Sequence, residues 1–191
     1  DRGQILWGSV GAPLVQLGEI NLGKWQPVTR VAKPHVYSWV MNNYWFTNFR
    51  VSQEGDFRWS YHLTSTSDTG AATATRFGWS SWIPLACRVL PATKSVRADV
   101  PNSRSLLGIE VPGVLMVDAR PASGGGVLVH LREVAGKGLV LDLSNVRSDL
   151  EITKAAEVNA LEEMVEDDIE ALQMKPNDVR FVRLQFGGAG E

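Results

Sequence analysis

Short apolar runs broken by turn residues constrain the fold of this chain more than any other feature. Along Val127–Glu133 apolar and polar residues alternate, so that Val127, Val129 and Leu131 share one face of a strand. Similar runs between residues 105 and 186 end at glycine and proline. Seven strands spaced by roughly 8–12 residues predict an antiparallel β-sandwich over 105–186, and we expect a tail over 187–191.

The turns between these runs also predict which strands pair. Ser123–Gly126 reads as a hairpin turn, because it leads into a strand rather than into a helix. Residues 135–138 separate the run 127–133 from the run 139–143. We therefore expect those two runs to form a second hairpin.

The front of the chain is built differently, since all 7 tryptophans lie between Trp7 and Trp82. Residues 35–64 contain its strongest strand signals, including an alternating run over 57–63 after a predicted turn at 54–56. Residues 68–82 predict one short helix that ends before Pro84. The expected domains are a Trp-rich β region with this helix over 1–104, part of a larger sandwich, and the sandwich over 105–186, with the boundary in 88–104.

Composition excludes several classes of protein. The chain has 191 residues and a formal net charge of −2, which provides no general attraction for nucleic acid or for an anionic membrane. One cysteine, Cys87, excludes an intrachain disulfide, and we expect it to be a small buried apolar residue. Because the chain begins with Asp1 and shows no leader, we interpret it as a piece of a longer or processed protein, and a cytoplasmic location is favoured over secretion.

Patterns that indicate catalysis are not found in the sequence. The three histidines, His35, His62 and His130, lack the spacing of a metal site, so no metal ligand and no catalytic residue is assigned. The acidic residues near 162–168 are interpreted as a solvated loop close to a turn. We therefore expect no cofactor on this chain.

An aromatic and amide-rich stretch is the best candidate for a binding site. Sugar rings stack on tryptophan and tyrosine while asparagine bonds their hydroxyls, and a ligand site needs this mixture. The alternatives are core packing for each tryptophan and a turn for the asparagine pair. The candidates that would face a carbohydrate are Asn42, Asn43, Tyr44, Trp45 and Asn48.

Several motifs together resemble the C-terminal β-rich region of glycoside hydrolase family 38, the retaining α-mannosidases. The stretch 38–49 contains Met41-x-Asn43-x-Trp45-x-Thr47-Asn48-Phe49, and Gln53-x-Gly55 follows it. The later segments are Arg132-x-x-x-Gly136, Val158-Asn159-x-Leu161-Glu162-Glu163 and Lys175-Pro176. The resemblance covers residues 35–186. One departure is Tyr44, where relatives often have histidine.

The resemblance implies a galactose mutarotase-like sandwich that supports a catalytic domain and lines its carbohydrate cleft. In that family the nucleophile, the acid and the ligands of zinc or another divalent metal lie N-terminal to this region. By this resemblance the chain alone is no enzyme, and its partner is an N-terminal catalytic domain whose parent protein is a glycosidase.

Two alternatives remain. A free-standing carbohydrate-binding module would use the aromatic residues, and a structural or homo-oligomeric domain would use exposed apolar surface. If Trp7, Trp25 and Trp82 face a partner, they should be exposed.

Overall fold

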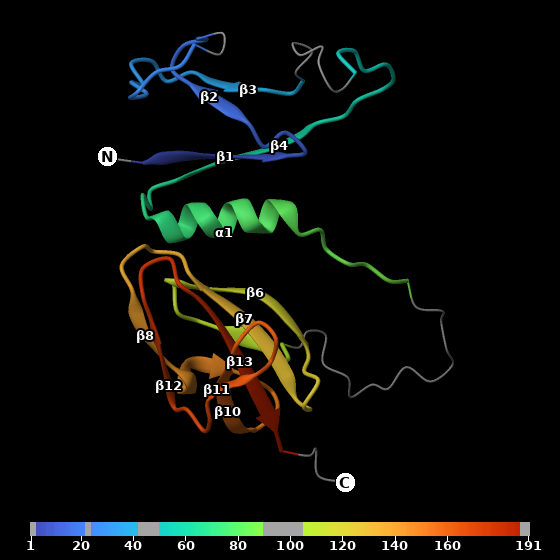
Figure 1. The fold of residues 1–191 in the computed structure, drawn as a ribbon, viewed down its shortest axis with the longest axis vertical. Helices are drawn as coiled ribbons and strands as arrows, with labels where there is room; N and C mark the ends of the chain where they lie inside the picture. Colours follow the sequence, from blue (N-terminus) through green and yellow to red (C-terminus); the bar gives the residue numbers. More distant parts are fainter. Residues whose placement is uncertain (1–2, 22–23, 42–49, 90–104, 188–191) are drawn as a thin grey trace. The chain divides into compact units, whose positions relative to one another are not determined.

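The structure is a computed structural model that describes residues 3–21, 24–41, 50–89 and 105–187. The described residues are mostly β, with antiparallel sheets and one α-helix, α1 (Ala71–Trp82) (Figure 1). Two compact units are present. Unit 1 comprises Asp1–Ser67 and Phe77–Pro84, and unit 2 comprises Asp68–Arg76 and Leu85–Glu191.

Unit 1 is built from two antiparallel ribbons. Strand β1 (Gln4–Val10) pairs with β4 (Ser60–Thr66) over seven residue pairs, from Gln4 with Thr66 to Val10 with Ser60. Strand β2 (Val15–Leu17) pairs with β3 (Val36–Ser38). A pairing that joins residues so far apart in sequence is not visible in local periodicity.

The strand expected over 57–63 therefore needs correction. The strand begins at Ser60 rather than Phe57, and its partner is β1. Tyr61 and Leu63 do share one face, as the alternation predicts. Residues 42–49, which contain part of the expected partner strand, lie outside the described residues.

Helix α1 confirms the prediction of one short helix near 68–82. Asp68 precedes it and accepts hydrogen bonds from the Gly70 backbone N–H at 2.8 Å and from the Thr73 hydroxyl. These bonds satisfy the backbone donor just before the helix and a hydroxyl within its first turn, and a carboxylate is favourable at a helix N-terminus. The helix ends at Trp82, two residues before Pro84.

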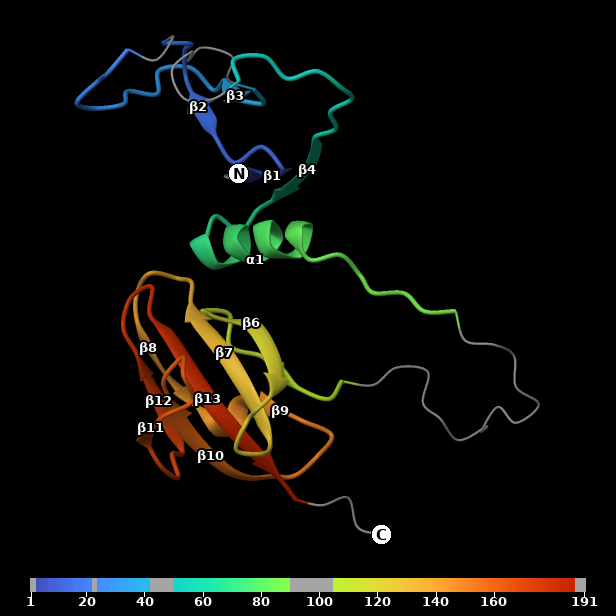
Figure 2. The same cartoon turned by 45° about the vertical axis from the view of Figure 1, so that its right-hand side comes forward.

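Unit 2 contains a five-stranded antiparallel sheet, and Figures 1 and 2 show its strands from two sides. In spatial order the sheet consists of β11 (Met164–Glu166), β10 (Ile152–Val158), β13 (Val179–Phe186), β7 (Val127–Glu133) and β6 (Val114–Pro121).

Two shorter ribbons complete unit 2. Strand β12 (Ala171–Met174) pairs with β8 (Leu139–Asp142), and β5 (Gly108–Ile109) pairs with β9 (Val146–Arg147). The 3₁₀ turn η1 (Leu143–Asn145) joins β8 to β9. Nine strands thus lie between residues 105 and 187, where the sequence predicts seven.

The core of unit 2 lies between the five-stranded sheet and the β8–β12 ribbon, an arrangement typical of a β-sandwich. Leu131 from β7 and Val182 from β13 pack with Leu141 from β8 and Met174 from β12. Each of these four side chains is at most 1% exposed. By contrast, Leu6 and Ala12 are the buried apolar residues among the described part of unit 1.

The expected pairing of residues 127–133 with 139–143 is wrong. Strand β7 pairs with β6 and β13, whereas β8 pairs with β12 in another sheet. The segment between β7 and β8 crosses from one sheet to the other and is not a hairpin turn. The hairpin through Ser123–Gly126 is confirmed, because β6 and β7 are paired on either side of it.

Candidate functional site

The residues expected to face a carbohydrate lie outside the described residues. Asn42, Asn43, Tyr44, Trp45 and Asn48 belong to the segment 42–49. Their binding role therefore stays a prediction.

Two aromatic residues beside that segment are described. Tyr37 in β3 lies edge-on to His35, with its hydroxyl 3.3 Å from Nδ1 of that ring. Trp39 is 43% exposed, and its backbone N–H donates to the Leu14 carbonyl at 2.9 Å. Strand β3 and the residue after it thus place a half-buried tyrosine and an exposed tryptophan just before the predicted site.

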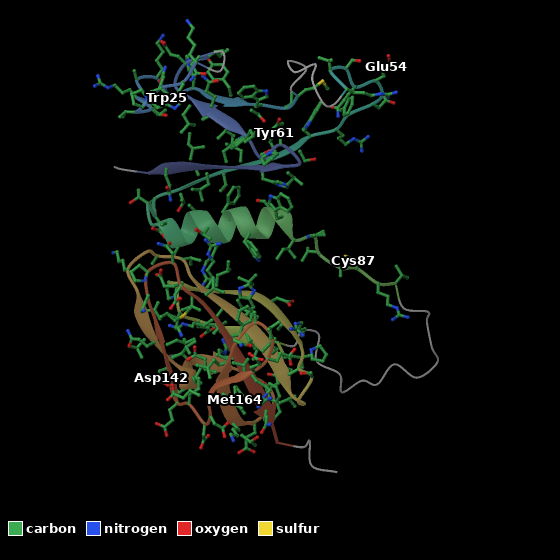
Figure 3. The ribbon with its side chains drawn as sticks, in the orientation of Figure 1. Trp25, Glu54, Tyr61, Cys87, Asp142 and Met164 are labelled. Carbon is green, nitrogen blue, oxygen red and sulfur yellow. The ribbon has the colours of Figure 1, made fainter. Side chains whose placement is uncertain are left out.

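An apolar surface lies on one face of the β1–β4 ribbon, formed by Ile5, Trp7, Tyr61 and Leu63. We call it the ribbon face. The rings of Trp7 and Tyr61 stack with centroids 5.5 Å apart, and Figure 3 labels Tyr61 on β4. The Tyr61 hydroxyl donates to the Ser38 hydroxyl of β3 at 3.0 Å, but Ile5 is 73% exposed and Leu63 is 69% exposed. A sheet face with this composition is normally covered by another element.

The opposite face of the same ribbon is covered within unit 1. Leu6 is buried there, and Gly8 lies against α1, where an added Cβ would meet Phe77 and Ser81 at 3.7 and 3.6 Å. The Trp82 indole N–H also donates to the Ser9 carbonyl at 3.2 Å. The contrast between the two faces makes the ribbon face a candidate interaction surface.

The tryptophans of the described residues are all at least partly exposed. Trp25, in the loop between β2 and β3 (Figure 3), is 85% exposed, and Trp82 is 62% exposed. Trp7 is half-buried. Exposure of Trp25 and Trp82 therefore agrees with the expectation for residues that face a partner, whereas Trp7 is partly covered by Tyr61.

Glu133 forms a buried polar centre in unit 2 that the sequence analysis did not identify. Its side chain is fully buried at the end of β7. Its carboxylate accepts hydrogen bonds from the backbone N–H groups of Ala135 at 2.8 Å, Gly136 at 2.9 Å and Asn177 at 2.7 Å, with a longer one from Lys137. The Glu133 carboxylate therefore links the segment between β7 and β8 to the loop before β13.

Two opposing effects set the pKa of Glu133. Burial disfavours the charged carboxylate and alone would raise the pKa. The backbone N–H groups of Asn177, Ala135, Gly136 and Lys137 stabilise the charge and together outweigh burial, so the pKa lies below its ordinary value. The carboxylate is held by backbone donors at neutral pH, which indicates a structural role.

The acidic run near 162–168 is only partly the solvated loop that we expect from the sequence. Glu162, with a side chain 10% exposed, accepts hydrogen bonds from the Ser123 backbone N–H at 2.7 Å and its hydroxyl at 2.6 Å, and pairs with Arg120 at 2.8 Å. The Ser123 hydroxyl is the main reason that the pKa of Glu162 is lowered. This carboxylate ties the turn after β10 to the β6–β7 hairpin.

A second ion-pair group lies at the start of β13. Arg180 donates to Glu157 at 2.6 Å and to Asp178 at 2.9 Å. The hydrogen bond to Glu157 is the main reason that the pKa of Arg180 is raised. Because both carboxylates have a partner, this group is a structural crosslink of β10 and β13.

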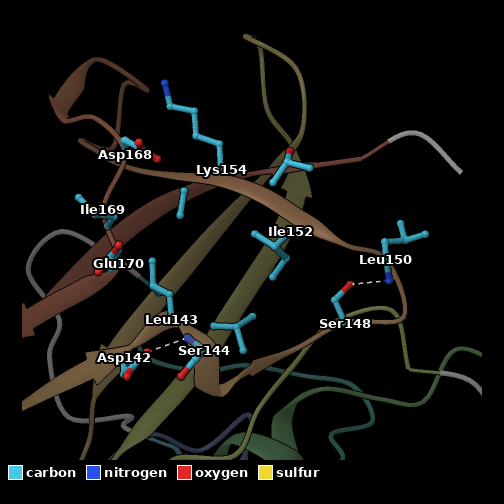
Figure 4. Close-up of a pocket in the computed structure, with 13 residues that line it drawn as sticks. Asp142, Leu143, Ser144, Ser148, Leu150, Ile152, Lys154, Asp168, Ile169 and Glu170 are labelled. Atoms are coloured by element: carbon cyan, nitrogen blue, oxygen red, sulfur yellow. Dashed lines mark hydrogen bonds between the residues drawn. The ribbon is translucent and has the colours of Figure 1, made fainter.

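An open pocket of about 620 Å³ lies in unit 2, between η1, β10 and the loop between β11 and β12 (Figure 4). Its polar lining includes Asp142, Lys154, Asp168 and Glu170. Asp142 accepts from the Ser144 backbone N–H at 2.8 Å, and the Ser144 side chain is the main reason that its pKa is lowered. Sequence reasoning missed this site because its residues are separated along the chain and meet only in the folded sandwich.

Two other expectations concern reactive residues. Cys87 is exposed rather than buried, because the segment after α1 does not pack into a core (Figure 3). His130 stacks on Phe181 with centroids 4.7 Å apart, and burial lowers its pKa. Over the part of the chain that the structure describes, no group of three or more metal-ligating side chains is found, and no helix there is long and apolar enough to cross a membrane.

Comparison with known proteins adds no family assignment. No protein-family model matches the chain, and no curated protein matches it either.

Proposed function

We propose that this chain is a non-catalytic C-terminal β-sandwich region of a family 38 α-mannosidase-like glycosyl hydrolase. In this role the ribbon face of unit 1 docks on the catalytic domain, where the segment 42–48 lines the carbohydrate cleft. The exposure of Ile5 and Leu63 on the ribbon face is the observation that carries the proposal.

The motifs that resemble the family support this proposal through their structural roles in unit 2. Asn159 begins the Asn-x-Leu-Glu-Glu motif, and its side-chain oxygen accepts the backbone N–H groups of Leu161 at 2.9 Å and Glu163 at 3.0 Å. Glu162 in the same motif bonds to Ser123. Residues of this type at this spacing are needed to form the turn, which gives the motif a physical reason.

Unit 1 also supports docking on a protein partner. Most of the large apolar residues in the described part of unit 1 are at least two-fifths exposed, among them Leu14, Ile20, Val28 and Val31. Contiguous exposed apolar surface usually marks a protein interaction site. A sandwich that covers a catalytic domain would bury such a surface in the complete protein.

A binding experiment tests the docking. The chain is mixed with the catalytic domain of a family 38 α-mannosidase that lacks its own C-terminal sandwiches, and complex formation is measured by analytical ultracentrifugation. We expect a one-to-one complex that Leu63→Asp abolishes, because the charge would be buried against apolar surface. Leu161→Asp, at an exposed leucine in unit 2, is the matched control and should bind as the wild type does.

Two outcomes would contradict the proposal. If the chain alone hydrolyses an aryl α-mannoside, and the activity follows it through purification, it is not a non-catalytic region. If Leu161→Asp weakens the complex as much as Leu63→Asp does, the ribbon face is not the docking surface.

The second candidate is a free-standing carbohydrate-binding module, which the exposed rings of Trp25 and Trp39 favour. It predicts that millimolar mannobiose changes tryptophan fluorescence and that Trp45→Ala removes the change. A response in the absence of any catalytic domain would favour this candidate, whereas no response to a panel of sugars would count against it.

A further inference from the structure

The pocket of unit 2 has a strongly acidic environment. The lining residues all come from the segment 142–170, which contains 10 Asp and Glu but only 2 basic residues, Arg147 and Lys154. Arg147 is paired with Glu110. Glu157 and Glu162 in this segment pair with Arg180 and Arg120 outside it. The lining itself has the carboxylates of Asp142, Asp168 and Glu170 and the ammonium of Lys154, a formal charge of −2 that favours cations.

The one ammonium group in the lining is already engaged. The Nζ of Lys154 lies 2.7 Å from the Asp167 carboxylate, and this hydrogen bond is the main reason that the pKa of Asp167 is lowered. In contrast, the carboxylates of Asp168 and Glu170 have no hydrogen bond or ion pair to any residue that the structure describes. Two acceptors thus remain for a ligand.

The hydroxyl groups of the lining are also used within unit 2. The Ser148 hydroxyl donates to the Leu106 carbonyl at 2.9 Å and accepts the Leu150 N–H at 3.1 Å. The Thr153 hydroxyl donates to the Gln185 carbonyl at 3.3 Å. A ligand therefore meets mainly acceptors at this site, and it must supply the donors itself.

Apolar side chains form another part of the lining, and Figure 4 shows Leu143, Leu150, Ile152 and Ile169 around the opening. Ile169 is buried and the other three are half-buried. Hydrocarbon can pack on these side chains while a polar end reaches the carboxylates, which is the usual division within a ligand site.

We propose that this pocket binds an alkylammonium group, either of a free diamine or of a lysine side chain, with its hydrocarbon stem on Ile152 and its nitrogen at Asp168 and Glu170. A metal ion is a poorer choice, because no cluster of three or more ligating side chains occurs among the described residues. The proposal goes beyond the docking role and does not depend on it.

The proposal can be tested by NMR titration of the full chain. The probes are 1,5-diaminopentane, an acetylated and amidated Gly-Lys-Gly peptide, and uncharged 1,5-pentanediol. We expect the two ammonium probes to shift backbone amide peaks around the pocket, with weaker binding at higher salt because the charges are screened. Tighter binding of one ammonium probe identifies the source of the ligand.

Matched variants separate the pocket from the general acidity of the segment. Glu170→Gln and Asp168→Asn should each weaken diamine binding roughly two- to fivefold, the range of an exposed ion pair. Asn is chosen because Asp168 has a φ of 54°, a left-handed conformation that Asn tolerates. Glu166→Gln removes the same charge from β11, outside the lining, and should change binding much less.

Three results would overturn the proposal. The first is that pentanediol shifts the pocket peaks as strongly as the diamine. The second is that Glu166→Gln weakens binding as much as Glu170→Gln. The third is that mannobiose shifts these peaks while neither ammonium probe does, which would assign the pocket to a saccharide.

Discussion

Replacing Glu133 with glutamine should lower the free energy of unfolding of unit 2 by about 3 kcal/mol. The change conserves size, but an NH₂ group replaces one of two acceptor oxygens. It then faces the backbone N–H groups of either Ala135 and Lys137 or Gly136 and Asn177, depending on which oxygen it replaces. Hydrogen bonds to a charged group contribute about 1.5–3 kcal/mol each, and buried donors without a partner add to the loss. Urea unfolding followed by circular dichroism measures the difference.

The effect of this substitution should depend on pH. The folded-state pKa of Glu133 is lowered, so its carboxylate stabilises the fold fully above the unfolded-state pKa of about 4.3. As the pH falls through the lower folded-state value, the carboxylate takes up a proton and the contribution is lost. The stability difference between wild type and Glu133→Gln should therefore shrink below about pH 4.3.

Glu166→Gln is the control for Glu133→Gln, because Glu166 is exposed on β11. Its stability should stay within about 0.5 kcal/mol of wild type. A Glu133→Gln protein as stable as this control would show that the backbone N–H groups do not depend on the Glu133 carboxylate.

Gly126→Ala should destabilise unit 2 by about 3 kcal/mol, because this glycine meets two separate restrictions. Its φ of 81° lies in the left-handed region, and an added Cβ would lie 2.2 Å from the carbonyl oxygen of Leu184 on β13. Since backbone cannot rotate away as a side chain does, either β7 or β13 must shift. Thermal unfolding by calorimetry measures the loss.

The neighbouring glycine provides a matched control. Gly125 has a φ of 84°, and nothing lies within 4 Å of an added Cβ. Gly125→Ala should therefore cost only the left-handed conformation, about 1 kcal/mol. Equal losses in the two variants would contradict the close approach of Leu184 to the hairpin.

Glu133 and Gly126 both lie in unit 2, so their substitutions should destabilise that unit, whereas the proposed docking uses the ribbon face of unit 1. Neither Glu133→Gln nor Gly126→Ala should therefore impair binding of the catalytic domain under conditions where the chain stays folded. Leu63→Asp should instead impair binding while leaving the free energy of unfolding nearly unchanged, because Leu63 is 69% exposed and contributes little to the core. This separation of stability from binding distinguishes a docking surface from a general loss of structure.

Much of the local structure could be predicted because local patterns determine it. The strands Ile152–Val158 and Val179–Phe186 lie within the region 105–186 where strands are predicted, since each is a run of strand-forming residues ended by turn residues. The helix Ala71–Trp82 follows from an acidic residue before it and a proline after it. The glycines at 124–126 predict the hairpin, because such a turn requires left-handed backbone.

Pairing and sites could not be predicted in the same way. The sequence places Leu139–Asp142 next to Val127–Glu133, but the two strands lie in different sheets, joined by a segment whose backbone donors Glu133 holds. Nothing in the sequence shows that the carboxylate of Glu133 turns back on its own loop. The pocket could not be predicted from the sequence either, because Asp142 and Glu170 come together only through the pairing of β8 with β12.

The sequence by itself determined the class of the protein: a mostly β chain of short antiparallel strands with one helix, because side-chain alternation and turn chemistry act over a few residues. Only the tertiary structure decided which strands pair, which charges are buried and which apolar side chains remain exposed. Those features depend on contacts such as the pairing of Gln4 with Thr66, between residues far apart in the chain, and these contacts form only when the chain folds.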